Sequence, residues 1–192
     1  MTAVYNETGP DAGVPWHYGD PLGEQRALER GEASVDLRHR PVFAVAGPER
    51  LTWLNALASQ KLTGLAPGEH ANAFLLDTSG RIEHVFAGVD DGETFWGHTE
   101  PGRLEPLLER LVAMRFTAKV EVRDASGERA VIVPAAGPQL VELDRIEDEL
   151  GGVRAGTWAS EALRIAAGQP RIFLDTDALT IPNELYMPEG DL

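Results

Sequence analysis

One stretch decides the fold class: residues 41–60, PVFAVAGPERLTWLNALASQ. It begins with a short apolar run that a Gly-Pro pair closes, which is typical of a buried strand ending at a turn. Pro48 suits the first turn of a helix, because its φ is fixed and it has no N–H to leave unpaired. Leu51, Leu54 and Leu57 recur at helical spacing and give that helix one buried stripe. The stretch therefore predicts a strand followed directly by an amphipathic helix.

The next residues extend this pattern through two hairpins. Ser79-Gly80 is typical of a tight turn between two strands. Leu104, Leu107, Leu108 and Leu111 recur at i, i+3, i+4 and i+7, which indicates a second amphipathic helix. We expect, in order, strands at 73–77, 81–86 and 94–98, a helix at 104–111 and a strand at 118–123. This order predicts an α+β fold with a split β-α-β (ferredoxin-like) arrangement, its helices on one face of a mainly antiparallel sheet.

The composition excludes several classes of function. The 192 residues contain 17 Lys+Arg against 31 Asp+Glu, a formal charge of −14. Such an acidic chain is a poor partner for nucleic acid or anionic membranes, since both need a positive face. With no cysteine, disulfides, thiolate metal sites and cysteine nucleophiles are excluded from these residues. The five scattered histidines do not have metal-ligand spacing, so we expect no metal site.

We expect three parts along the chain. Residues 1–18 lack the charged and apolar regions of a targeting signal and form an N-terminal arm. Residues 19–135 form a first α+β subdomain, and 136–192 a partial second one with an acidic helix over 140–150. No window approaches a membrane span, and a cytoplasmic protein is the default expectation.

Few residues stand out as candidate site residues on pattern alone. Glu83 and His84 are adjacent in a predicted strand, so at most one of them is expected to face a given pocket. Arg164 is a lone cation in the apolar stretch LRIAAG, where it must be exposed, paired or aimed at an anion. Glu161 is its obvious local partner. The pattern leaves both a salt bridge and a ligand contact open for Arg164.

An ordered set of motifs resembles the folate-binding YgfZ-like proteins, relatives of the glycine-cleavage T-protein (aminomethyltransferase), and is most similar to the actinobacterial type. The resemblance covers residues 16–134 and 153–186. The matching stretches are Tyr18-Gly-Asp-Pro-Leu, Glu24-Gln-Arg-Ala-Leu, Ala46-Gly-Pro-Glu-Arg-Leu-Thr-Trp-Leu-Asn-Ala-Leu57, Leu75-Leu-Asp-Thr-Ser-Gly-Arg-Ile-Glu-His84, Thr99-Glu-Pro-Gly-Arg103, Met114-Arg-Phe116, Trp158-Ala-Ser-Glu-Ala-Leu-Arg-Ile-Ala-Ala-Gly168 and Ile181-Pro-Asn-Glu184.

The resemblance implies α+β subdomains and a C-terminal barrel around a tetrahydrofolate pocket. It places Glu83 or His84 where the T-protein has an aspartate pair that includes its catalytic carboxylate, and no catalytic residue is assigned with confidence here. It places His98 where the T-protein has a folate-contacting asparagine, and Arg164 near the folate tail. Glu83, His98 and Arg164 are therefore the folate-binding candidates. The family's Lys-Gly-Cys segment should follow Glu184 and is absent, so we expect a fragment without the barrel.

The expected function is tetrahydrofolate binding by a YgfZ-like protein that supports maintenance or repair of iron–sulfur enzymes and thereby affects some tRNA thiolation. Its partners would be a folate ligand and iron–sulfur client proteins, without direct contact to nucleic acid or membrane. One alternative is an aminomethyltransferase that passes a one-carbon unit to tetrahydrofolate, which the Glu-His pair in place of Asp-Asp counts against. A second alternative is a non-catalytic interaction module that has kept the fold and lost the pocket.

Overall fold

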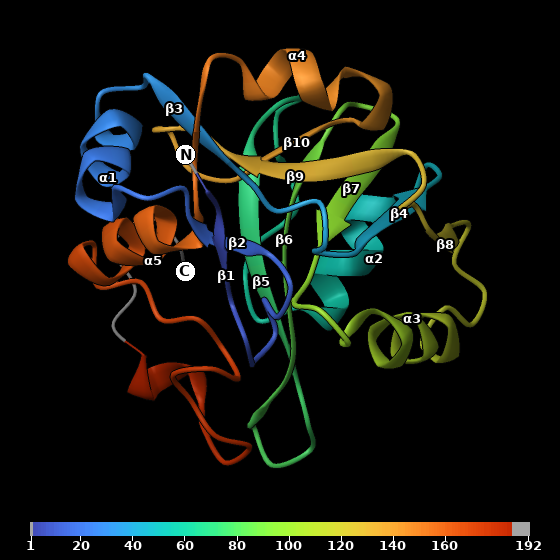
Figure 1. Cartoon of the computed structure of the whole chain (residues 1–192). Coiled ribbons are helices and arrows are strands. Elements are labelled where there is room, and N and C mark those ends of the chain that lie inside the picture. The colour runs from blue at the N-terminus through green and yellow to red at the C-terminus, as the bar shows by residue number, and fades with distance from the viewer. Residues whose placement is uncertain (1, 186–192) are drawn as a thin grey trace. The chain divides into compact units, whose positions relative to one another are not determined.

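A computed structural model describes residues 2–185, and its contacts group them into two compact units (Figure 1). One unit contains the residues up to Pro41 together with Ser126–Ala167. The other contains Val42–Ala125 together with the described residues from Gly168 onward. Neither unit is a continuous segment of the chain. The first unit is discontinuous because strands on either side of the Val42–Ala125 segment pair with each other. The residues after 185 lie outside the described part of the chain.

The second unit is built on a five-stranded antiparallel sheet with strand order β5-β6-β7-β4-β8. Its strands and helices follow the expected order of strand, helix, three strands, helix and strand, which confirms the α+β class. Sequence patterns misplaced some ends: β8 begins three residues later than the alternating pattern, and β5 begins earlier at His70. The elements are β4 (Val42–Ala46), α2 (Arg50–Leu57), β5 (His70–Leu76), β6 (Ile82–Asp90), β7 (Thr94–His98), α3 (Leu104–Ala113) and β8 (Glu121–Asp124).

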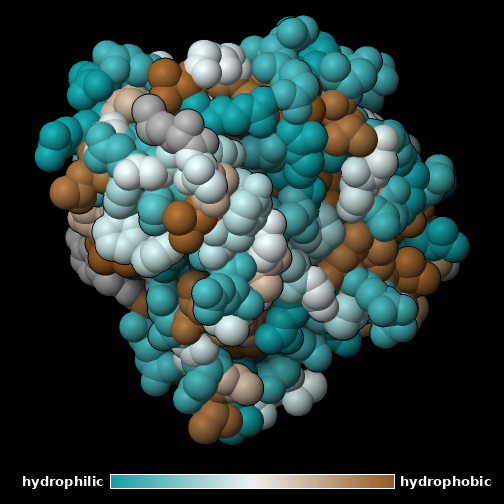
Figure 2. Space-filling model, in the orientation of Figure 1, coloured by the Kyte–Doolittle hydropathy of each residue, from teal (hydrophilic) through white to brown (hydrophobic). Residues whose placement is uncertain are grey.

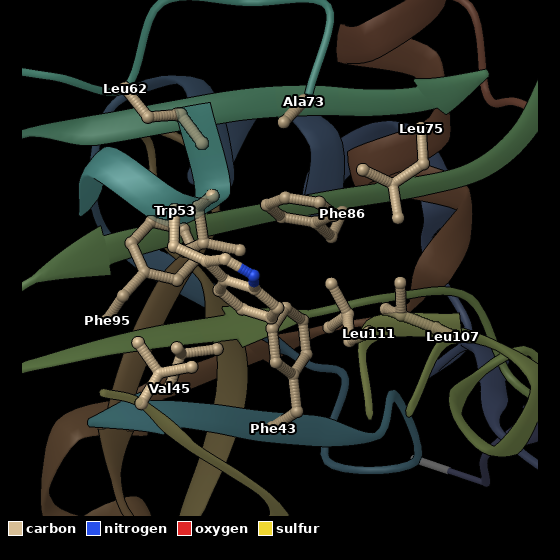
Figure 3. Close-up of a cluster of buried hydrophobic side chains, with 12 residues drawn as sticks. Phe43, Val45, Trp53, Leu62, Ala73, Leu75, Phe86, Phe95, Leu107 and Leu111 are labelled. Atoms are coloured by element: carbon tan, nitrogen blue, oxygen red, sulfur yellow. The ribbon is translucent and has the colours of Figure 1, made fainter. Parts of the chain in front are cut away.

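The main core of this unit lies between one face of the sheet and the helices α2 and α3. Phe86 meets Phe43 and Phe95 edge to face, with ring centroids 5.5 and 5.9 Å apart. Leu107 and Leu111 of α3 are fully buried in the same cluster (Figure 3). Burying side chains of this size stabilises the fold by about 1.5–3 kcal/mol each. The leucine stripe read from the sequence is therefore the buried stripe of α3.

The other face of this sheet carries a smaller cluster made by the chain after residue 168. Ile172 packs with Phe74 and Ile82, and Phe173 is partly buried against them. A buried ion pair fixes this segment, because the Arg171 guanidinium donates to Glu100 at 2.6 Å. The segment from 168 to 185 thus belongs structurally with β5 and β6, from which it is distant in the sequence.

The first unit has its own four-stranded sheet, with strand order β10-β9-β3-β11. Here β11 pairs with β3 in parallel, and β9 pairs with β3 antiparallel. The elements are β1 (Val4–Tyr5), β2 (Pro15–His17), α1 (Pro21–Glu29), β3 (Ala33–Asp36), β9 (Arg129–Val133), β10 (Gln139–Glu142), the 3-10 turn η1 (Leu143–Arg145), α4 (Ile146–Leu150), β11 (Val153–Ala155) and α5 (Thr157–Ala166).

One expectation about this unit is corrected. The acidic helix over 140–150 is a strand, a 3-10 turn and a one-turn helix, because β10 finds a hydrogen-bonding partner in β9. Near the N-terminus, β1 and β2 form an antiparallel hairpin. Buried Glu24 supports this region by accepting backbone N–H groups from Tyr18 and Gly156 at 2.7 and 2.9 Å.

The surface agrees with the acidic, polar composition. The face drawn in Figure 2 is mostly hydrophilic, with hydrophobic residues in scattered spots. Among residues 2–185, no helix is both long and apolar enough to cross a membrane.

Candidate functional site

A β-bulge in β6 sets the geometry of the candidate site. In the β5–β6 ladder Leu75 pairs with His84, but the next residue, Leu76, pairs with Ile82. Glu83 is the extra residue and has no partner in the register. Such a bulge re-aims side chains and is over-represented next to active sites. The register thus leaves Glu83 unpaired beside the paired His84.

Glu83 and His84 share the same charged neighbours. The Glu83 carboxylate lies 3.6 Å from the Arg110 guanidinium of α3, and both side chains are about two-fifths exposed, at 43% and 39%. His84 is buried, and burial lowers its imidazole pKa from 6.5, which the charges of Arg110 and Arg103 reinforce. The nearby Glu83 charge acts in the opposite direction. At neutral pH the bulge therefore offers a carboxylate beside a neutral imidazole.

Glu83 lines a cavity of about 310 Å³, hereafter the Glu83 cavity. Its walls come from the β5–β6 turn, the start of α3 and the segment after residue 172. The residues that matter for its chemistry are Asp77, Arg81, Glu83, Arg103, Phe173 and Asp177. Three carboxylates and two guanidinium groups therefore line one concave site, together with one aromatic ring.

The two arginines of the Glu83 cavity are available to a ligand. In the described part of the chain neither Arg81 nor Arg103 is within salt-bridge distance of a carboxylate, although acidic residues outnumber basic ones 31 to 17. The Arg103 guanidinium lies over the Phe173 ring, 4.0 Å from its centroid. Arg103 is also the N-cap residue of α3, where the helix dipole adds a positive potential. Both features favour an anion in this cavity.

The carboxylate of Asp77 is engaged by the turn rather than by a guanidinium. It accepts backbone N–H groups from Ser79 and Arg81 at 2.7 and 2.9 Å. The Arg81 backbone hydrogen bond is the main cause of a pKa below the usual 3.8 for Asp77. Asp77 therefore stays ionised and fixes the turn that carries Arg81.

Of the three sequence-predicted candidates, Glu83 and His98 belong to the second unit and Arg164 to the first. His98 is a buried residue of β7 that pairs with Ala87, so it lies on the sheet face opposite Phe86 and His84. Glu83 instead contacts α3. Arg164 lies in α5 of the other unit, where it donates to Glu161 at 2.5 Å. The local salt bridge that the sequence left open is thus present.

Sequence reasoning missed Arg81, Arg103 and Phe173. Arg103 ends one of the family-like motifs, which was the available signal for it. Phe173 carried no signal, because nothing in its neighbourhood predicts a left-handed backbone. Among residues 2–185 no cluster of three or more His, Asp or Glu side chains could hold a metal ion.

Comparison with known proteins gives the fold a precedent. A glycine cleavage system aminomethyltransferase T from Bartonella henselae superposes with a TM-score of 0.71, at 16% identity, over 88% of this chain and 60% of that one. The chain therefore shares its fold with part of that protein. No family model matches the sequence.

Two curated aminomethyltransferases are similar in sequence. A probable aminomethyltransferase of Natronomonas pharaonis is 26% identical over 134 residues, which cover 68% of this chain and 37% of that protein. An aminomethyltransferase of Rippkaea orientalis is 28% identical over 134 residues, which cover 67% of this chain and 36% of that protein. The matched stretch thus spans little more than a third of these relatives, and it supports the aminomethyltransferase side of the resemblance without distinguishing a YgfZ-like branch.

Proposed function

We propose that the chain binds tetrahydrofolate in the Glu83 cavity, as a YgfZ-like protein that supports the maintenance of iron–sulfur enzymes. The observation that carries this proposal is the Glu83 carboxylate lining one cavity with two arginines that form no salt bridge within residues 2–185. The similarity to aminomethyltransferases supports a folate as the ligand. The motif resemblance supports the YgfZ-like branch.

The residues of the cavity fit the chemistry of a folate. A pterin presents amino and ring N–H donors, which a carboxylate such as Glu83 accepts in charge-assisted hydrogen bonds. The glutamate tail is anionic and needs guanidinium donors, which Arg81 and Arg103 supply. A volume of about 310 Å³ lies at the lower end of the range for small-molecule sites, so a folate bound there would extend beyond it. Arg164 and His98 do not line this cavity, and their contact with a folate stays a prediction from the resemblance.

The second candidate function is aminomethyl transfer, which the two curated relatives favour. Tetrahydrofolate supplies the nitrogen acceptor for the one-carbon unit in that reaction. This chain would contribute Glu83 as a proton-accepting carboxylate held by Arg110 and His84 as its neutral neighbour. The Glu-His pair at the bulge, in place of two aspartates, is the reason we place this reaction second.

Calorimetric titration of the full-length protein with tetrahydrofolate tests the first proposal. We expect saturable binding that weakens about tenfold in Glu83→Gln, because one charge-assisted hydrogen bond is worth about 1.5–3 kcal/mol. Glu105→Gln is the matched control, since Glu105 is an exposed carboxylate of α3 outside the cavity. The absence of heat with wild-type protein would overturn the proposal.

Two further assays separate the alternatives. Cells lacking the protein should lose activity of iron–sulfur enzymes, and wild-type protein should restore it where Glu83→Gln does not. A reconstituted glycine-cleavage assay with a lipoyl carrier should show turnover only if the chain is an aminomethyltransferase. Partner capture that survives Arg164→Ala, in a protein that binds no folate, would instead support a non-catalytic interaction module.

A further inference from the structure

Phe173 has a backbone conformation that glycine normally adopts. Its φ is 70°, and in this left-handed region the Cβ of an L-residue approaches the following carbonyl oxygen. For a bulky side chain this is a genuine outlier rather than a common variation. Strained residues of this kind cluster at ligand clamps and active sites, where the surrounding structure holds them in place. Phe173 lines the Glu83 cavity.

Several independent contacts hold this strained turn. The Phe173 N–H donates to the Thr176 hydroxyl at 2.9 Å. The Arg171 carbonyl accepts the N–H groups of Leu174 and Asp175 at 3.1 and 2.9 Å. Arg171 itself is 5% exposed and is anchored through its ion pair with Glu100. The turn is therefore fixed before any ligand arrives, so the ring of Phe173 is presented to the cavity in one orientation.

Arg103 completes a two-part surface with Phe173. Its guanidinium carbon lies 4.0 Å from the ring centroid, within the range of a cation–π contact. A guanidinium presents five N–H donors, and a carboxylate can accept two of them at once. Arg81 lines the same cavity and also has no salt bridge among the described residues. The wall thus combines an aromatic surface with two available cations.

Packing alone accounts for only part of this arrangement. Phe173 is partly buried against Phe74, Ile82 and Ile172, which explains an apolar residue at this position. It does not explain why the residue keeps a left-handed backbone, because a glycine would relieve the strain. It also does not explain why the ring carries Arg103, which forms no salt bridge with a carboxylate of the described residues.

We propose that Phe173 and Arg103 form a specificity-determining platform for an aromatic carboxylate. The identity of this ligand as the p-aminobenzoyl-glutamate half of a folate rests on the proposed function. The benzoyl ring stacks against the platform, and the glutamate carboxylates pair with Arg103 and Arg81. Glu83, on the same cavity, is left to the pterin half. The platform therefore selects folates over free pterins, which lack the aromatic carboxylate.

The test uses p-aminobenzoyl-glutamate, tetrahydrofolate and a tetrahydropterin without the benzoyl-glutamate half, each titrated separately into the full-length protein and followed by NMR. Arg103→Gln and Phe173→Leu should weaken binding of the first two about tenfold, as expected for losing a charge-assisted or stacking contact. The same variants should leave tetrahydropterin binding within about twofold. This last readout would change along with the others if the variants merely disturbed folding.

The chain supplies matched controls. Phe116 also has a positive φ, of 44°, and is 79% exposed next to Arg115. Phe116→Leu and Arg115→Gln therefore make the same chemical changes outside the Glu83 cavity. Both controls should bind all three probes as wild type does. Thermal melting of every variant checks that it folds.

The outcomes separate the platform from the proposed function. If wild type binds tetrahydrofolate but Phe173→Leu and Arg103→Gln bind it equally well, the platform is wrong and the function stands. If wild type binds p-aminobenzoyl-glutamate through the platform but not tetrahydrofolate, the function is wrong and the platform stands. If wild type binds neither probe, both are overturned.

Discussion

Asp90→Asn is expected to destabilise the second unit by about 3 kcal/mol. Asp90 is the last residue of β6, and only 1% of its side chain is exposed. Its carboxylate accepts hydrogen bonds from Nε and Nη2 of Arg50 in α2, at 2.6 and 2.7 Å. The Gly92 N–H also donates to its Oδ1 at 2.9 Å. This pair holds α2 against the sheet at the end of the strand that carries the Glu83 bulge.

The magnitude follows from which contacts an amide can keep. The amide oxygen of asparagine can still accept the hydrogen bonds from Gly92 N–H and from one guanidinium nitrogen of Arg50. Its NH2 group is a donor and cannot accept the hydrogen bond from the other guanidinium nitrogen. Arg50 is 12% exposed, so water only partly replaces the lost partner. Removing one member of a buried ion pair costs about 3–5 kcal/mol, and the retained oxygen places the expected loss at the lower end.

Urea unfolding followed by circular dichroism measures this loss from the shift of the midpoint at constant slope. Glu93→Gln is the control, because Glu93 is exposed on the same hairpin. Adding Arg50→Met to Asp90→Asn should recover part of the stability, since it removes the uncompensated charge. A loss below about 1 kcal/mol in Asp90→Asn, or an equal loss in Glu93→Gln, would refute the reasoning.

Three further predictions follow from buried or crowded groups. Burial lowers the pKa of His84 below 6.5, so the unfolded chain binds the proton first and the free energy of unfolding should fall as the pH drops below 6.5. Urea titrations from pH 7.5 to 5 measure this dependence. The variant His84→Gln should flatten it, whereas the control His70→Gln, at an exposed position, should not. Gly47→Ala should lower the free energy of unfolding by about 2 kcal/mol or more, because the φ of Gly47 is 118° and an added Cβ would lie 2.3 Å from the Lys119 carbonyl oxygen. Equal melting temperatures of the variant and the wild type would contradict this. Glu24→Gln should cost about 1–3 kcal/mol by replacing one accepting oxygen with a donor, and hydrogen exchange at Gly156 should speed up.

The secondary structure of the second unit could be predicted from the sequence because its hydrophobic pattern is local. The leucine stripe of α3 and the turn at Ser79-Gly80 need only neighbouring residues, and each specifies one element. The strand pairing of the first unit could not be predicted in this way. Strand β3 has its partners in β9 and β11, and no local pattern encodes a pairing across so much intervening chain. The acidic residues around β10 likewise favoured a helix until β9 was available as a partner.

The candidate site was predicted in part for a similar reason. Glu83 was selected by resemblance, and it does line a cavity. The bulge at Glu83 carries no glycine or other sequence mark, so the shift in register could not be predicted. Phe173 needs a φ that its residue type disfavours, and only the contacts around it determine that conformation.

The split composition of the two units has a consequence for synthesis on the ribosome. The five strands of the second unit's sheet occupy an unbroken segment, whereas β3 ends at Asp36 and its partner β9 starts only at Arg129. At about 5–20 residues per second, β3 waits about 5–20 s for that partner. Nascent chains arrested when residues 42–125 have left the exit tunnel but β11 has not should therefore resist proteolysis across 42–125 before the first sheet is complete; equal sensitivity of both regions would contradict this order. Phe173 leaves the ribosome later still, so the Glu83 cavity is completed only after the strands of both sheets have been made.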